Sequence, residues 1–346
     1  MSNTFGMGAQ LAANAARFGW FYGVNRYMDG QAQRLGQKPG YRPKRPVPKQ
    51  QELMGALANL FLADAEAVRR GLYPPMDAEP TSLMPLIGRL QGMLADLPGA
   101  LARRASEDAE SVRAEPGAEN LPDYYAQDFH FQTGGYLSAE SARLYDVQVE
   151  TLFYGAANAM RRAALGPIAE EMRGRDQRKV AMLDVACGTG RFLRQARLAW
   201  PAMKLTGIDL SPAYLAEASR HIKPLRSVHV VTGNAEAIPL PDASQDIVSV
   251  IFLFHELPPE VRRRVAGEME RVLKPGGLLV FIDSLQMGDR PGWDGLLEAF
   301  PVRFHEPYFR HYATDDLDAL FTDAGLAGET QSLAFMSKVM VRRKVR

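Results

Sequence analysis

Short apolar segments alternate with helical segments after about residue 178, and this alternation constrains the fold more than any other feature. The apolar runs are Val180–Val185, Leu205–Ile208, Val228–Val231, Ile247–Phe252 and Leu278–Ile282. The helical segments that separate most of them cover 191–200, 212–222, 259–273 and 314–324. Continuous apolar strands joined by helices are typical of a parallel sheet covered on both faces. With two closing strands within 330–344 as its edge, we expect an α/β fold with a mostly parallel seven-stranded sheet.

The N-terminal half has another pattern, of helices and connectors without a convincing strand. Helices are predicted within 5–35, over 53–68, over 81–95 and over 138–165. The last of them should begin at Ser138, whose side chain is a good N-cap. A polar, acid-rich stretch near 105–120 is expected to be a surface linker. A helical N-terminal region therefore precedes the sheet.

Residues 30–51 combine six basic residues, no acid and four prolines. The prolines forbid a helix, so we expect an extended connector. Beside the aromatic helix within 5–35, such a connector would favour an anionic membrane surface, by about 1 kcal/mol per basic residue near the lipid. The basic C-terminus, 342–346, would add to this if it lies on the same face. The alternative is that a basic, proline-rich linker is simply solvated.

Composition excludes several classes of protein. The chain has 346 residues with 41 Lys and Arg against 40 Asp and Glu, so charge gives no reason to expect nucleic acid as a partner. The single cysteine, Cys187, excludes an internal disulfide and cysteine-ligated zinc or iron–sulfur sites. Residues 1–16 lack the basic start of a signal peptide, and we find no apolar run long enough to cross a membrane. We expect a cytoplasmic protein.

The strongest chemical signal is a glycine loop after the first apolar run. Gly188 and Gly190 let the backbone approach a ligand closely between a strand and a helix. The chain has no Gly-Lys-Ser/Thr here, and Leu193 stands where a dinucleotide fingerprint needs its third glycine. Asp184, just before the loop, would repel a pyrophosphate and attract a cation. A nucleoside-like ligand with a positive charge is therefore favoured over a nicotinamide dinucleotide.

Acidic and amide residues follow the next two strands. Asp209 ends the second strand, nineteen residues after Gly190, where a carboxylate can accept hydrogen bonds from ribose hydroxyls. The stretch 233–236, Gly-Asn-Ala-Glu, follows the third strand and would offer polar groups to the edge of a base. Taken alone, Asp209 could be a helix cap or a surface acid. Together with the loop it indicates a nucleoside site.

Four ordered motifs resemble those of class I S-adenosylmethionine-dependent methyltransferases, most of all the branch with ubiquinone and menaquinone C-methyltransferases. They lie at 184–190, 207–212, 233–236 and 271–277, and the resemblance covers roughly 140–346. It implies a Rossmann-like fold and S-adenosylmethionine as cofactor. The cofactor-binding residues that it implies are Asp184, Ala186, Gly188, Gly190, Asp209, Leu210, Asn234, Ala235, Ile251 and Phe252. The family usually has Asp where Asn234 stands, so we expect altered affinity but not lost binding.

The resemblance also implies a division of the chain. Residues 166–346 would be the methyltransferase domain, 121–165 a helical cap packing on the cofactor site, and 1–120 a helical region that includes the basic connector. Tyr136, Tyr145 or His130 would close over the cofactor, although packing between helices and sheet explains these residues equally well.

His255 and Glu256 are the candidate catalytic residues, because they follow the fourth strand beside the expected methyl group. Histidine suits general-base work near neutral pH. Glu256 would orient it, although consecutive residues of a strand point to opposite faces. The alternative for His255 is a structural role, bonding to the next loop's backbone.

Residues 285–313 are rich in aromatic residues and histidines, and so long a loop suits a lid over a flat or apolar acceptor. The candidate substrate-binding residues are His130, Tyr136, His305, Tyr308, His311 and Tyr312. The alternative is a loop anchored by its own aromatic side chains. No residue is assigned as a metal ligand.

These observations favour a methyltransferase for a small, largely apolar acceptor: a quinone-type ring, a lipid or an aromatic metabolite. A non-catalytic S-adenosylmethionine-binding subunit with a regulatory or assembly role is the alternative. Methylation of RNA or protein lacks a basic face on the sheet domain, and arsenic methylation lacks thiolates. The sequence does not fix the oligomeric state.

Overall fold

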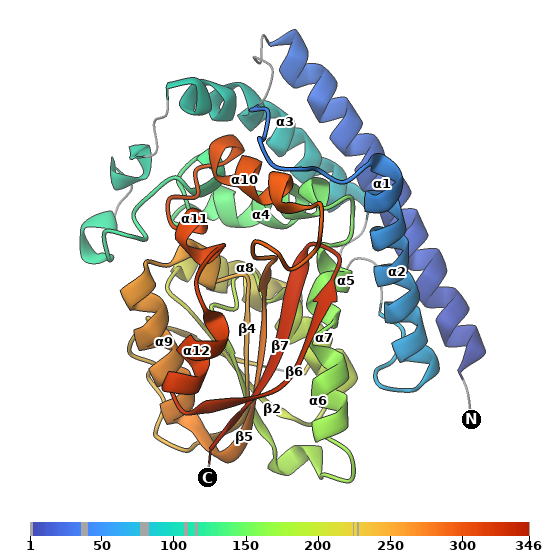
Figure 1. Cartoon of the computed structure of the whole chain (residues 1–346), viewed down its shortest axis with the longest axis vertical. Helices are drawn as coiled ribbons and strands as arrows, with labels where there is room; N and C mark the ends of the chain where they lie inside the picture. The colour runs from blue at the N-terminus through green and yellow to red at the C-terminus, as the bar shows by residue number, and fades with distance from the viewer. Residues whose placement is uncertain are drawn as a thin grey trace.

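A seven-stranded sheet forms the centre of the computed structural model, which describes residues 3–35, 41–76, 83–106, 110–114, 117–223, 225–226 and 228–345 (Figure 1). The strand order is β3-β2-β1-β4-β5-β7-β6, and β7 runs antiparallel to the other six strands, which are parallel to one another. The strands are β1 (Ala181–Val185), β2 (Lys204–Asp209), β3 (His229–Thr232), β4 (Gln245–Ile251), β5 (Leu273–Ser284), β6 (Leu326–Ala334) and β7 (Ser337–Lys344). The predicted seven-stranded, mostly parallel sheet is confirmed, and β6 is its edge.

Helices cover both faces of this sheet. In Figure 1, α6 and α7 lie on one side of it, and α9 and α12 on the other. The helices of this layer are α5 (Ala157–Arg162), α6 (Leu165–Glu171), α7 (Arg191–Ala199), α8 (Pro212–Ile222), α9 (Pro259–Val272) and α12 (Leu317–Asp323). The start of α8 is the one that the sequence predicts, because Ser211 accepts a hydrogen bond from the Tyr214 amide and Pro212 is the first helical residue.

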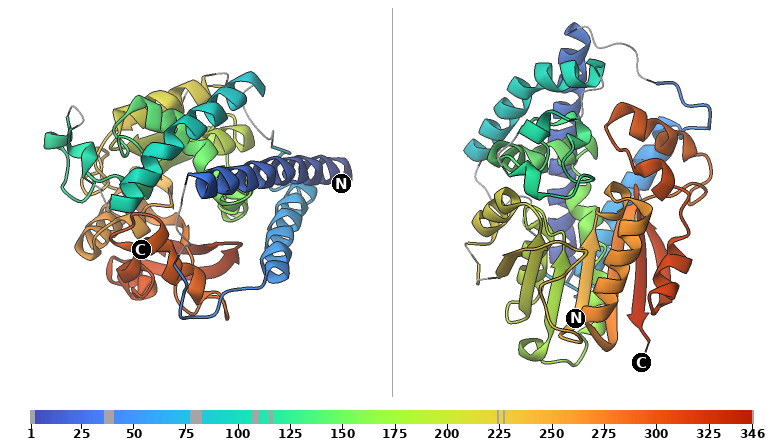
Figure 2. Two further views of the ribbon diagram at one scale, coloured as in Figure 1. Left: turned by 90° about the horizontal axis from the view of Figure 1, so that it is seen from above. Right: turned by 90° about the vertical axis from the view of Figure 1, so that its left-hand side faces the viewer.

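The N-terminal helices pack on the first of them, and the first and third also pack against the cap helix α4 (Ala139–Leu152). They are α1 (Thr4–Arg34), α2 (Gln50–Arg69) and α3 (Leu83–Ser106); α2 packs beside the long α1, as Figure 2 shows. Asp64 interrupts the apolar face of α2 because it forms a buried ion pair with Arg162 of α5, 2.7 Å from Nε. Among the described residues, no helix combines the length and apolarity that crossing a bilayer requires.

The prediction of one long helix over 138–165 is wrong, since the chain forms α4, α5 and α6 instead. The break falls at Tyr154 and Gly155, whose φ angles are +53° and +80°. A Cβ at Gly155 would lie 2.8 Å from the Arg17 carbonyl oxygen of α1. Glycine at position 155 therefore lets the backbone of α1 approach closely at the point where α4 has ended.

Two predicted loops also contain helical structure. Residues 285–313 hold α10 (Asp294–Arg303) and the short α11 (Phe309–Tyr312), which lie near α4 above one end of the sheet in Figure 1. Within 105–120 the chain forms two short 3₁₀ turns, Ser111–Ala114 and Ala118–Asn120. The residues between these turns at 115–116, and those at 107–109, lie outside the described residues.

The basic connector is irregular over 41–49, as predicted, but its backbone is fastened to α10. The Glu298 carboxylate accepts hydrogen bonds from the Tyr41 hydroxyl at 2.6 Å and from the amides of Lys44 and Arg45. The Gly295 amide donates to the Pro46 carbonyl at 2.8 Å. Residues 30–34 belong to α1, and 36–40 lie outside the described residues. The connector is therefore a strap on α10, and membrane contact stays a prediction.

The described part of the basic C-terminus, 342–345, is engaged within the protein, and Arg346 lies outside the described residues. Arg342 lies in β7 with 2 % of its surface exposed, pairs with Asp318 and donates to the Leu326 carbonyl. Lys344 forms an ion pair with Glu270 at 3.0 Å. Both side chains are therefore paired with acids of the protein and do not add to a free basic surface.

Candidate active site

A pocket of about 730 Å³ opens at the carboxyl ends of β1, β2 and β4. It brings together eight of the ten predicted cofactor residues: Ala186, Gly188, Asp209, Leu210, Asn234, Ala235, Ile251 and Phe252. Its opposite wall consists of tyrosines, namely Tyr124, Tyr125, Tyr136, Tyr145 and Tyr214. A nucleoside would therefore lie between the sheet and the aromatic residues of the cap, although the individual roles of these residues stay predictions.

The glycine loop owes its shape to left-handed backbone conformations. Ala186, Gly188 and Gly190 have φ angles of +54°, +53° and +74°. A Cβ at Gly190 would lie 2.8 Å from the Cβ of Ala218, so glycine also lets α8 pack against the loop. Gly190 itself precedes α7 as its N-cap and does not line the pocket.

Asp209 connects this loop to the end of β2. Its Oδ2 accepts a hydrogen bond from the Gly188 amide at 2.8 Å, and its Oδ1 accepts one from the Ser211 amide at 2.9 Å. Burial raises the pKa of the Asp209 carboxyl group to about 6. The side chain lines the pocket at the position where the sequence predicts a ribose contact.

Asp184 lies behind the loop and does not line the pocket. Its side chain is buried, and Oδ1 accepts a hydrogen bond from the Ser249 hydroxyl at 2.6 Å. Burial raises the pKa of Asp184 to about 7, with the Asp209 charge as a lesser cause. Any contact of Asp184 with the methionine end of a cofactor would therefore be indirect.

A second pocket, of about 650 Å³, adjoins the first, and we call it the acceptor pocket. It shares Tyr145, Phe252 and Glu256 with the cofactor pocket. The rest of its lining is His130, Val149, Leu152, Phe153, His255, Ser284, Leu296, Leu297, Phe300 and Met336. Leucines and a phenylalanine of α10 thus close an apolar chamber whose polar groups gather at one end.

A third pocket, of about 890 Å³, continues from the acceptor pocket between α1, α3 and α4. The two share His130, Tyr145, Val149 and Leu152. Met28, Met93, Leu97 and Phe304 give it further apolar lining. We call it the rear pocket; its walls come largely from the N-terminal helices, for which the sequence predicts no function.

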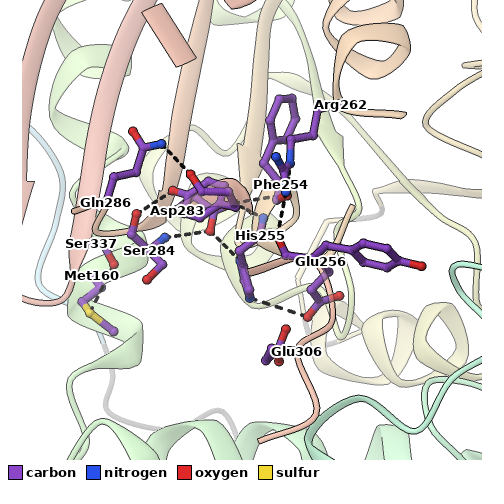
Figure 3. Close-up of polar contacts among 12 residues, drawn as sticks. Met160, Phe254, His255, Glu256, Arg262, Asp283, Ser284, Gln286, Glu306 and Ser337 are labelled. Carbon is purple, nitrogen blue, oxygen red and sulfur yellow. Dashed lines mark hydrogen bonds and ion pairs between the residues drawn. The ribbon is translucent and has the colours of Figure 1, made fainter. Parts of the chain in front are cut away.

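His255 lies in a 3₁₀ turn after β4, with its ring held by an acid of β5 (Figure 3). Nδ1 is 2.5 Å from Oδ1 of Asp283, whose other oxygen accepts the Phe254 amide. Burial lowers the pKa of His255, but the Asp283 carboxylate outweighs it, and the pKa rises to about 10. A histidine with this pKa is protonated at neutral pH, so it donates hydrogen bonds or stabilises an anion.

Asp283 takes the orienting role that the sequence assigned to Glu256. Oε1 of Glu256 lies 3.8 Å from Nε2 of His255, which is too far for a hydrogen bond. Glu256 instead accepts a hydrogen bond from the Tyr136 hydroxyl at 2.5 Å, and burial raises its pKa to about 7. Sequence reasoning missed Asp283, although an acid directly after the apolar run of β5 was a usable signal.

Two further groups meet at this polar end, His130 and Glu306. Nδ1 of His130 is 3.2 Å from Oε1 of Glu306, and its Nε2 is 4.0 Å from Oε1 of Glu256. Burial, helped by the nearby His255 and His305, lowers the pKa of His130 to about 3, so its ring is neutral. Burial also raises the pKa of Glu306 well above its usual value.

The structure does not bring the other candidate acceptor residues to these three pockets. His305 and Tyr308 both bond to the Gln127 side chain, at 2.8 and 3.1 Å. His311 is half exposed and contacts Arg262, and the buried Tyr312 donates to the Ser284 carbonyl at 2.5 Å. These side chains fasten α11 and its flanking loop to the rest of the protein, whereas Tyr136 lines the cofactor pocket and His130 the acceptor pocket.

The sheet order, the glycine loop and the acid that ends β2 define a class I S-adenosylmethionine-dependent methyltransferase domain. Residues 182–277 match a family model described as "Methyltransferase domain". A demethylmenaquinone methyltransferase of Listeria welshimeri is 36% identical over 138 residues, 39% of this chain and 57% of the relative. A ubiquinone/menaquinone biosynthesis C-methyltransferase of Methylobacterium nodulans is 32% identical over 165 residues, 47% and 63% of the two chains.

The chain thus spans less than two thirds of the length of these relatives. Among solved structures, a S-adenosylmethionine-dependent methyltransferase from Aquifex aeolicus is 22% identical, with a TM-score of 0.40. That match covers 53% of this chain and 93% of the other.

Proposed function

We propose that the protein transfers the methyl group of S-adenosylmethionine to a small, largely apolar acceptor with a quinone-type ring. The main support for this proposal is that the cofactor pocket and the acceptor pocket share part of their lining. Phe252 and Glu256 belong to both, so a ring in the acceptor pocket would lie beside the methyl group. Methyl transfer requires this proximity and a site from which water is excluded.

The chemistry of the acceptor pocket supports a ring that is apolar but carries oxygen atoms. Leu296, Leu297 and Phe300 of α10 would cover the ring, while His255 and Glu256 would bind its oxygens at the polar end. The quinone methyltransferases among the relatives agree with such an acceptor. A few polar groups in an apolar chamber are the usual design for orienting a ligand of this kind.

The rear pocket supports an apolar substituent on that ring. It continues from the acceptor pocket past Val149 and Leu152, and methionines and leucines line it. A chain of several carbon atoms would bury apolar surface there, at about 0.8 kcal/mol per methylene group. The N-terminal helices would then help to select the acceptor.

Methyl-labelled S-adenosylmethionine and two reduced naphthoquinones, one with a prenyl tail and one without, test this function. We expect label in an organic-extractable product with either ring, and a lower KM for the tailed ring. Asp209→Ala is the control that removes cofactor binding. Cofactor binding without transfer to either ring, or to a membrane or aqueous cell fraction, would contradict the proposal and leave a non-catalytic binding protein. Label confined to aqueous products would contradict the quinone-type acceptor.

Val149→Phe tests the rear pocket separately, because Val149 lines both pockets at their junction. The larger ring should raise KM more for the tailed acceptor than for the tail-free acceptor, because Val149 also lines the acceptor pocket. Val302→Phe, at a valine of α10 with 39 % of its surface exposed, is the matched control. Equal effects of Val149→Phe on both acceptors would refute the assignment of the rear pocket to the tail.

A further inference from the structure

Three side chains at the polar end of the acceptor pocket have the arrangement of a cation site. His130, Glu256 and Glu306 each offer one ligand atom, and these atoms all lie within 4.8 Å of one another. We propose that the three residues bind one divalent first-row transition cation beside the methyl acceptor. The role of this cation in methyl transfer rests on the proposed function, whereas cation binding itself does not.

The distances in this group suit a common cation. Ligand atoms about 2.1 Å from a metal ion lie roughly 3 Å apart when they are adjacent and about 4.2 Å apart when they are opposite. An imidazole binds one ion through a single nitrogen: Nδ1 of His130 lies 3.2 Å from Oε1 of Glu306, and one ligand atom from each of the three residues lies within 4.8 Å of the other two. Small side-chain adjustments would complete the coordination.

Glu306 provides independent support for a cation. It has 2 % of its surface exposed, and neither of its oxygens has a hydrogen-bond partner among the residues that the structure describes. The neutral ring of His130 lies 3.2 Å from its Oε1, and Figure 3 shows Glu306 beside Glu256. A buried carboxyl group without a donor is costly, and an ion is one of the accepted explanations.

The neighbouring charges do not neutralise this pair of acids. His255 is engaged with Asp283 at 2.5 Å, so its positive charge is matched within that pair. Tyr136 gives Glu256 one hydrogen bond but no charge. A divalent cation would replace the proton that burial favours on Glu306 and would then balance both carboxylates.

The donor set also indicates the class of cation. One imidazole nitrogen with two carboxylate oxygens suits Mn²⁺, Fe²⁺ or Zn²⁺, whereas Mg²⁺ prefers oxygen ligands alone. Three protein ligands leave coordination positions open, and His130 and Glu256 both line the acceptor pocket. A phenol or enol oxygen of the acceptor would occupy an open position, which would fix the ring and favour its oxyanion.

Binding of Mn²⁺ to the chelator-treated full chain, measured by electron paramagnetic resonance without cofactor or acceptor, tests this site. We expect one Mn²⁺ per chain, and Glu306→Gln should weaken binding by more than about tenfold. Glu260→Gln is the matched control, because Glu260 is an exposed acid on α9. His130→Gln should weaken Mn²⁺ binding in the same way.

Thermal unfolding separates lost ligation from a damaged fold. Glu306→Gln keeps the shape of the side chain and removes a buried carboxyl group, so in chelator it should melt at or above the wild-type temperature. Added Mn²⁺ should raise the melting temperature of the wild type and of Glu260→Gln, but not of Glu306→Gln.

Two results would overturn the site: no Mn²⁺ bound by the wild type, or equal binding by Glu306→Gln and the wild type. If the wild type binds no Mn²⁺ but methylates the ring in chelator, the site fails and the proposed function stands. If Mn²⁺ binds through Glu306 while no acceptor is methylated, the site stands and the proposed function fails.

Discussion

Asp146 of α4 links the cap to the glycine loop of the cofactor pocket. Asp146→Asn tests how much this link contributes to the stability of the protein. Oδ1 accepts a hydrogen bond from the Thr189 hydroxyl at 2.7 Å, and Oδ2 lies 2.9 Å from Nε of Arg191. Thr189 belongs to the glycine loop, and Arg191 is the first residue of α7. All three side chains are buried. The change removes a charge that the cap supplies to the loop.

The size of the effect follows from burial and charge. Burial raises the pKa of Asp146, but Arg191, His221 and Arg161 outweigh it and lower the pKa from 3.8 to about 2. At 1.36 kcal/mol per pKa unit, this shift is a stabilisation of about 2 kcal/mol at neutral pH. Loss of the acid also leaves the Arg191 charge buried, so we expect Asp146→Asn to lower the free energy of unfolding by about 3–5 kcal/mol.

The pH dependence has a definite sign. Because the folded-state pKa is depressed, the contribution of Asp146 is complete above its unfolded value of 3.8 and is lost as the pH falls through about 2. The difference between wild type and variant should therefore stay constant from pH 8 to about pH 7, above the titration of the neighbouring His221. Urea unfolding followed by circular dichroism at several pH values measures it.

Glu140→Gln on the same helix is the matched control. Glu140 pairs with Arg143 on the surface, its side chain is 57% exposed, and its loss should cost less than about 1 kcal/mol. An Asp146→Asn cost no larger than that of the control would refute this account of the cap. So would a difference that changes steeply between pH 8 and about pH 7.

Three further changes test other parts of the structure. Asp209→Asn should weaken binding of S-adenosylmethionine. The wild type should lose affinity as the pH falls through about 6, the raised pKa of Asp209, and the variant should not. Calorimetry that finds the same pH dependence of affinity in both proteins would contradict this. Gly155→Ala should destabilise the protein by about 1–3 kcal/mol, because the φ angle of residue 155 is +80° and the new Cβ would meet the Arg17 carbonyl. An unchanged melting temperature would refute the clash. Glu298→Gln should leave cofactor binding intact but raise acceptor KM and protease cleavage of the strap, because Gln keeps only one of the two acceptor oxygens that Tyr41 and the backbone amides use. Unchanged cleavage would argue against the strap.

The strands were predictable because each is a short apolar run whose neighbours are buried on both faces, as with Val180–Val185 and β1. The cap was less predictable. Apolar spacing over 138–165 continues through Gly155, and only the packing of α1 shows why the chain turns there. Likewise α10 is a helix that the aromatic composition of 285–313 does not reveal.

The cofactor side of the site was predictable because its residues stand in ordered motifs next to strand ends, as Asp209 does. The acceptor side was predictable only in part, because its groups come from distant segments: His130, His255 and Glu256 were candidates, and Asp283 and Glu306 were not. Asp283 and Glu306 reach the polar end only through the fold, and neither belongs to a motif. Aromatic content alone also could not show that His311 and Tyr312 fasten α11 instead of lining a pocket.

Fastening of the strap, residues 41–49, to α10 affects the order in which parts of the protein can fold during synthesis. Every residue of the cofactor pocket lies between Tyr124 and Val265, whereas the acceptor pocket needs Leu296, Phe300 and Met336. A ribosome delivers the N-terminal segments first, so residues 41–49 must wait for α10, their anchor near the other end of the chain. Contacts between such distant segments form slowly. A nascent chain would therefore form its nucleoside cradle early and close the chamber for the acceptor last.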